Sequence, residues 1–167
     1  VGHNDKNLPV GRYRAHDSLQ FLRKDLKEKV GSSGRPVILM HHIDLLRYST
    51  SSSENSERGG EWSACDVAAF HEAIQGYQIA AIFHGHLHAL RTDRWDGTNK
   101  NAAEGGIPIF GARASGAHGT NRGLFYCVVE GEELIIRELA SLGAHEGWLE
   151  ENTQWVNQWR VPLRTRV

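Results

Sequence analysis

The chain has 167 residues, of which 40% are hydrophobic and five are Trp. A chain of this size and composition can bury a sizeable core, which excludes a disordered polypeptide and predicts one domain over residues 1–167. The net charge of −1 gives no electrostatic reason to expect a nucleic acid or a membrane surface as partner, and no segment reaches the roughly 18 apolar residues of a membrane span.

The first helix is expected over residues 18–30. Asp17 suits its N-cap and Gly31 its stop. One face of this helix is apolar at helical spacing (Leu19, Leu22, Leu26 and Val30). A polar loop then leads into the apolar run Val37–Met40, which predicts a strand that ends at His41 and His42.

A polar loop and a second helix follow. Residues 47–60 are rich in Ser and polar side chains, so an ordinary surface loop is the favoured interpretation and a lid over a substrate is the alternative. Ser63 and Asp66 form a capping box for a helix that runs to about Gln75 and stops at Gly76. The order helix, strand, helix, strand is typical of an α/β crossover.

The apolar run Ile79–Phe83 predicts a buried strand of a parallel sheet, and the motif Gly85-His86-Leu87-His88 follows it. Ligands and metals collect outside the carboxyl ends of such strands. A His-x-His sequence at this place therefore indicates a transition-metal site. His84, just before the motif, is expected to pack or to hydrogen-bond behind the ligands.

Histidine and related donors follow two other expected strand ends. His41 and His42 come after the earlier strand, and Val1 precedes His3 and Asn4 at the start of the chain. A single His after a strand is usually a surface or capping residue. Three strand ends that carry such residues together favour a metal centre.

Antiparallel β structure is expected after the histidine motif. Residues 90–95 form a strand that ends at a hairpin-type turn, Asp96-Gly97, and residues 107–110 form the next. Residues 124–129 and 133–139 flank Glu130-Gly131-Glu132, which predicts a second hairpin.

Two features of the C-terminal half remain open on the sequence alone. The glycine-rich segment 111–123 carries Arg113, His118 and Arg122, which suit a phosphate, but turn chemistry explains it better. Trp148, Trp155 and Trp159 suit one helix face or an irregular arm, with core packing favoured over ligand stacking. The cysteines, Cys65 and Cys127, are expected to be buried thiols.

These motifs resemble the second half of a calcineurin-like metallophosphoesterase. The family carries, in order, Asp-x-His, Gly-Asp-x-x-Asp, Gly-Asn-His-Asp/Glu, a strand-end His and Gly-His-x-His. The last three correspond here to Gly2-His3-Asn4-Asp5, to His41 and to Gly85-His86-Leu87-His88. The resemblance implies a mixed α/β fold, in which mixed sheets form a sandwich flanked by helices.

The resemblance also implies a chemistry. Metal-dependent hydrolysis of a phosphomonoester or phosphodiester would use Mn, Fe or Zn, two ions in the complete site. His41, His86 and His88 would be metal ligands with Asn4 as a fourth, and His3 would be the acid. His42 competes with His41 for its role.

Two departures from the family pattern matter. Asp-x-His and Gly-Asp-x-x-Asp are absent, so we expect the C-terminal part of a larger domain, whose remainder is a possible separate polypeptide partner. The order His3-Asn4 is transposed relative to the family. Both departures favour the alternative of a degenerate, non-catalytic module that binds a metal or a partner. A mononuclear zinc hydrolase that uses only the three histidines is a third alternative.

Overall fold

The computed structural model describes residues 15–48, 64–98, 102, 105–114, 121–143, 148 and 150–163. The helical elements are α1 (Ala15–Asp25), the π-helix η1 (Leu26–Val30), α2 (Leu45–Tyr48), α3 (Ala64–Ile74) and the 3₁₀-helix η2 (Glu150–Asn152). The strands are β1 (Val37–Met40), β2 (Ile79–His84), β3 (Arg91–Trp95), β4 (Ile107–Gly111), β5 (Arg122–Glu130), β6 (Glu133–Ser141) and β7 (Thr153–Pro162).

The first sheet has four strands in the order β1-β2-β4-β3. β2 is a central strand that pairs in parallel with both β1 and β4, whereas β3 runs antiparallel to β4. Five of the six residues of β2 are buried, which confirms the expected buried strand of a parallel sheet. The carboxyl ends of β1, β2 and β4 consequently meet at one edge.

The second sheet is antiparallel, in the order β5-β6-β7. Glu130 pairs with Glu133, so the loop between β5 and β6 is the two-residue Gly131-Glu132, and the predicted hairpin is confirmed. Gly131 has φ +60°, a conformation that glycine adopts without steric cost and that tight hairpins require.

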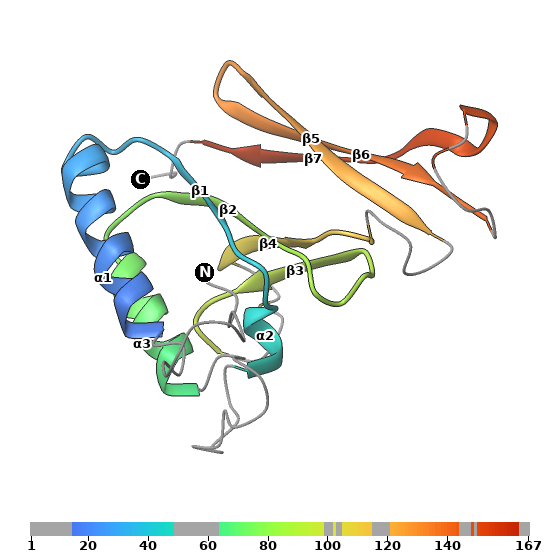
Figure 1. The fold of residues 1–167 in the computed structure, drawn as a ribbon. Coiled ribbons are helices and arrows are strands. Elements are labelled where there is room, and N and C mark those ends of the chain that lie inside the picture. The colour runs from blue at the N-terminus through green and yellow to red at the C-terminus, as the bar shows by residue number, and fades with distance from the viewer. Residues whose placement is uncertain are drawn as a thin grey trace.

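The molecule consists of three layers, which are the helices, the first sheet and the second sheet (Figure 1). Ile82 and Ile109 lie in one core with residues of α1 and α3. Phe83 and Phe110 lie in another core with Leu134 of the second sheet. Because successive strand residues point to opposite faces, both faces of the first sheet are used for packing. The mixed fold of two sheets with flanking helices is therefore confirmed.

The N-terminal helix differs from its prediction at both ends. It begins at Ala15, so Asp17 lies inside it rather than at its N-cap. Its last turn widens into η1, where Gly31 (φ +52°) donates its N–H to the carbonyl of Leu26 at 2.9 Å and ends the helix as expected. The predicted apolar face is confirmed, since Leu19 and Leu26 are core residues and Leu22 and Val30 pack against them.

Three further expectations from the sequence were wrong. Asp96-Gly97 does not join a tight hairpin, because Trp95 pairs with Ile107 and residues 96–106 intervene. The tryptophan-rich tail is neither a helix nor an irregular arm but strand β7, which gains hydrogen bonds along β6. Both cysteines, Cys65 on α3 and Cys127 on β5, are exposed rather than buried.

The tail tryptophans divide between packing and exposure. Trp159 packs on Phe110 and Phe125, with ring centroids 5.4 and 6.0 Å away, whereas Trp155 is exposed and lies edge-on to Tyr126 on β5. Trp148 is also exposed. Core packing therefore holds for only one of the three. None of the helices seen in the described ranges is long and apolar enough to cross a membrane.

Candidate functional site

The loops that follow β1, β2 and β4 are tied together by backbone hydrogen bonds at the carboxyl edge of the first sheet. His41 donates its N–H to the carbonyl of Phe83 at 3.0 Å, and Gly85 donates to the carbonyl of His42 at 3.1 Å. Ala112, after β4, donates to the carbonyl of His84 at 2.8 Å. The ends of β1 and β2 thus converge, as the sequence predicted, and β4 joins them, whereas the predicted strand end at Val1 lies outside the described residues.

A cavity of about 820 Å³ opens at this edge, between the first sheet and β5. Its described lining contains five histidines and one arginine, and no Asp or Glu. The remaining lining residues are mostly apolar or small. The lining residues are Ile38, Met40, His41, His42, Phe83, His84, Gly85, His86, His88, Ala112, Arg113, Ala114, Gly123, Leu124, Phe125 and Cys127.

Two of the histidines form what we call the inner pair, His41 and His84. Their rings stack with centroids 6.2 Å apart and planes 12° from parallel. His41 also lies edge-on to Phe70 of α3 at 5.9 Å, and both of its ring nitrogens are out of contact with solvent. Burial, and then the neighbouring His84, lower the pKa of His41 from 6.5 to about 3. At neutral pH this imidazole is uncharged.

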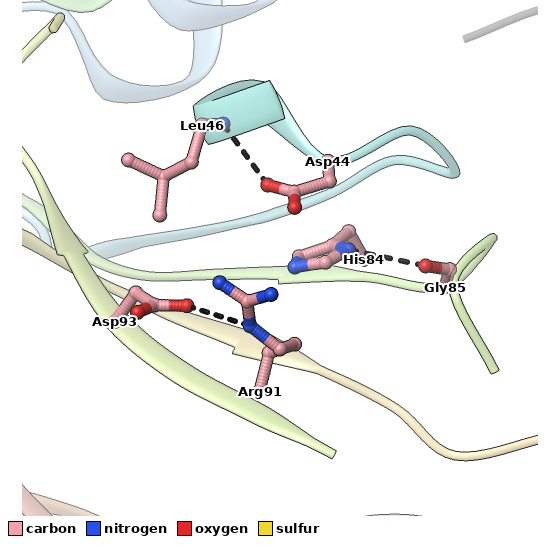
Figure 2. Close-up of polar contacts among 6 residues, drawn as sticks. All are labelled: Asp44, Leu46, His84, Gly85, Arg91 and Asp93. Atoms are coloured by element: carbon pink, nitrogen blue, oxygen red, sulfur yellow. Dashed lines mark hydrogen bonds and ion pairs between the residues drawn. The ribbon is translucent and has the colours of Figure 1, made fainter. Parts of the chain in front are cut away.

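His84 lies in a buried, polar environment (Figure 2). Its Nδ1 lies 3.1 Å from the carbonyl oxygen of Gly85. Burial lowers its pKa, and the nearby carboxylate of Asp44 opposes that shift. Asp44 is itself buried and accepts a hydrogen bond from the N–H of Leu46 at 2.9 Å, which fixes the start of α2.

Gly111 provides the space for the His84 ring. A Cβ atom there would lie 2.8 Å from Cε1 of His84 and 2.9 Å from Cβ of Arg91, closer than real contacts allow. The last residue of β4 is thus a glycine because an imidazole from β2 passes over it.

The other close contact is what we call the outer pair, His42 and His86. The rings meet edge-on at 5.2 Å, and Nδ1 of His86 lies 3.4 Å from Nε2 of His42. Two imidazole nitrogens bound to one tetrahedral zinc lie roughly 3.3 Å apart, because each Zn–N bond is about 2.0–2.1 Å. An N–H···N hydrogen bond gives a similar distance, so the pair is compatible with both arrangements.

The histidines of the motif have unusual backbone conformations. His86 has φ +64° and His88 has φ +53°, in the left-handed region, whereas Gly85 does not. Leu87 between them donates its N–H to the carbonyl of Gly85 at 2.7 Å. Left-handed non-glycine residues cost of order 1–3 kcal/mol each and persist where the surroundings impose them, often at functional sites.

The described residues fit the implied metal centre only in part. Within the ranges that the structure describes, no three side chains of His, Cys, Asp or Glu are grouped closely enough to hold a metal ion. His42 and His86 supply a pair of nitrogens, and His41 and His88 line the same cavity. The predicted acid His3 and ligand Asn4 lie outside the described residues.

Sequence reasoning missed a buried ion pair behind the cavity. Nε of Arg113 donates to Oε1 of Glu138 at 2.8 Å, and Nδ2 of Asn157 donates to Oε2 at 2.7 Å. Glu138 is fully buried on β6. The signal was present in the sequence, because Glu138 occupies the inward position of a period-two pattern between Ile136 and Ala140.

Several predicted features lie partly or wholly outside the described residues. Residues 49–60 of the proposed loop or lid and the capping Ser63 are among them, as is His118 of the glycine-rich segment. Of the cations of that segment, Arg113 lines the cavity and Arg122 is buried at the start of β5.

No protein-family model matches the chain, and no curated protein matches it. Among solved structures, the chain is similar to a crystal structure of a single mutant of Vps29 from Entamoeba histolytica. The identity is 14% and the TM-score 0.35, over 64% of this chain and 51% of the Vps29 chain. The likeness is a distant one of fold to a protein of the calcineurin-like metallophosphoesterase type, and the chain spans about half of that relative.

Proposed function

We propose that this chain carries the histidine side of a metal-dependent phosphoester hydrolase, with its centre in the cavity at the carboxyl ends of β1 and β2. The observation that supports this proposal most is the convergence of five imidazoles on one cavity, with the outer pair at a ligand-like spacing of 3.4 Å. Imidazole is a preferred ligand of Zn, Fe and Mn-type ions, and its neutral form is the one that binds.

The residues have distinct roles in this proposal. His86 and His42 bind the ion first, because they already lie side by side, and His41 and His88 are the further nitrogen donors from the same lining. Asn4 would add an amide oxygen and His3 would protonate the leaving group. A bound divalent ion would lower the pKa of a coordinated water and offset charge on the phosphoryl oxygens. The low pKa of His41 keeps it in the ligating form down to acidic pH.

A non-catalytic module that binds one metal ion or a partner is the second candidate. The absence of Asp-x-His and Gly-Asp-x-x-Asp from the sequence favours it, as does the lack of a three-donor group among the described residues. For the hydrolase, the oxygen donors would come from an additional polypeptide segment.

Metal titration of the full chain tests the proposal. The protein is stripped with a chelator, Zn²⁺ and Co²⁺ are added, and binding is followed by calorimetry and by the visible absorption of Co²⁺. We expect one ion per chain and a loss of affinity on the order of 10–100-fold in His86→Ala and in His42→Ala. The matched control is His71→Gln, since His71 lies on α3 against Trp95 and does not line the cavity.

Hydrolysis of bis(p-nitrophenyl) phosphate then separates the two candidates. Turnover that requires the added ion and disappears in His86→Ala supports the hydrolase. Stoichiometric metal binding without turnover supports the non-catalytic module. Absence of binding, or equal binding in His86→Ala and in the control, contradicts the hydrolase and the metal-binding form of the module.

A further inference from the structure

The composition of the cavity wall is unusual for a phosphoester site. Its described lining holds the cationic Arg113 and five imidazoles but no carboxylate. A wall without anionic groups favours an anionic ligand, because no like charge opposes it. Arg113 is therefore the fixed positive charge of the described wall.

Arg113 is held in place from behind. Its Nε donates to Glu138, which does not line the cavity and whose second oxygen is bonded by Asn157. The pair uses one of the five N–H groups of the guanidinium, and the other four belong to its two terminal nitrogens. Gly123 makes room for the arginine stem, since a Cβ there would lie 3.1 Å from Cδ of Arg113. The side chain is thus preorganised before a ligand arrives.

The other part of the wall is apolar. Ile38 and Met40 project from the edge strand β1 and are 41% and 78% exposed, and Leu124 on β5 is 43% exposed. Phe83 and Phe125 line the same cavity, with ring centroids 5.5 Å apart. A volume of about 820 Å³ is that of a site for a whole organic molecule rather than a free phosphate ion.

We propose that the cavity binds organic phosphates that carry an aromatic or other apolar group, with Arg113 on the phosphate oxygens and the β1–β5 wall on the apolar group. This inference deepens the proposed function, because it names the substrate class of the same site. Arginine suits a tetrahedral oxyanion through its paired N–H donors. Glu138 and Asn157 act through Arg113 and are positioning residues.

Binding of three probes to the full chain tests the inference: phenylphosphonate, inorganic phosphate and benzyl alcohol, measured by calorimetry with and without Zn²⁺. Phenylphosphonate should bind at least about tenfold more tightly than phosphate, because its ring leaves water. Benzyl alcohol, which lacks the anion, should bind more weakly than phenylphosphonate by about tenfold or more. Equal affinities for phenylphosphonate and phosphate would overturn the inference.

Substitutions test which residues bind the apolar group of the ligand and which bind its phosphate. Leu124→Ser should weaken phenylphosphonate but not phosphate, whereas Val129→Ser, an exposed apolar position farther along β5, should change neither. Arg113→Gln leaves Glu138 buried without its cation and is at risk of unfolding. The double variant Arg113→Gln/Glu138→Gln keeps a neutral hydrogen-bonding pair, and it should weaken both anions about tenfold or more.

Arg137→Gln is the matched control for the arginine, since Arg137 bonds Gln158 on the second sheet and does not line the cavity. Anion binding that is unchanged in the double variant, or lost equally in Arg137→Gln, overturns the role of Arg113. The proposed function fails separately. If no metal binds while phenylphosphonate binds as expected, the inference stands and the hydrolase does not. If the metal binds but the phenyl group gives no gain, only the inference is lost.

Discussion

The inner pair, His41 and His84, and the outer pair, His42 and His86, differ in burial although their members lie within two residues of one another after the same two strands. The inner rings are stacked, covered by Phe70 and surrounded by buried groups that include Asp44. The outer rings meet edge-on at the cavity, where His42 is exposed. His84 is the last residue of β2, whereas His42 and His86 lie in the loops beyond the strands, where His86 takes a left-handed conformation.

The difference in burial assigns different roles to the two pairs, and the sequence alone does not reveal these roles. The inner imidazoles are buried, and His41 packs against Phe70 of α3, so changes to them should appear first in stability, and for His41 also in metal binding. The outer imidazoles have the 3.4 Å nitrogen spacing and the access to the cavity that a ligand site needs, so changes to them should appear in binding.

The largest expected effect is a loss of stability in acid through His41. Its folded-state pKa, about 3, is below the unfolded value of 6.5, so the unfolded chain binds the proton first. The stabilisation is complete above the unfolded pKa and is lost as the pH falls toward the folded pKa. Between about pH 7 and pH 4 this single group should remove about 3 kcal/mol from the free energy of unfolding.

Urea denaturation of the chelator-treated protein, compared with His41→Gln, measures that contribution. The variant should be less stable at neutral pH but should lose less stability on acidification. If both proteins lose the same stability between pH 7 and pH 4, burial does not hold His41 neutral and its pKa is not lowered in the folded protein.

A smaller loss of stability is expected when a side chain is added at Gly111, next to the ring of His84. Gly111→Ala places a Cβ 2.8 Å from the His84 ring and should destabilise the fold by about 1–3 kcal/mol. Gly85→Ala, beside the outer pair, places a Cβ at 3.4 Å from Nδ1 of His42, an ordinary contact, and should cost less. Thermal unfolding of both variants makes the comparison; equal costs would contradict the difference in packing.

The smallest effect concerns the backbone of the histidine motif. His88 has φ +53°, so His88→Gly should raise the stability by about 1 kcal/mol relative to His88→Ala, which keeps the steric cost. Both variants remove the imidazole and should weaken metal binding equally. A glycine variant no more stable than the alanine variant would show that the left-handed conformation carries no strain.

The sequence identified the edge of the sheet but not the arrangement of its histidines. The apolar runs before His41 and His86 predicted two strands correctly, because a short continuous apolar run is typical of a strand in a parallel sheet. Only β2 is buried along its length, whereas the edge strand β1 leaves Ile38 and Met40 exposed. The hairpin at Gly131 was equally local. The roles of His42 and His84 depend on ring contacts between different strands, which spacing along one strand does not encode.

The sequence by itself determined strands β1 and β2, their histidine-bearing ends, the apolar face of α1 and the β5–β6 hairpin. Each rests on local periodicity or turn chemistry, which a few neighbouring residues fix. Only the tertiary structure decided that β4 runs parallel to β2, that the tail is strand β7, and that Glu138 fixes Arg113 behind the cavity. These depend on contacts between residues far apart in the chain, whose free energy appears only when the layers pack together.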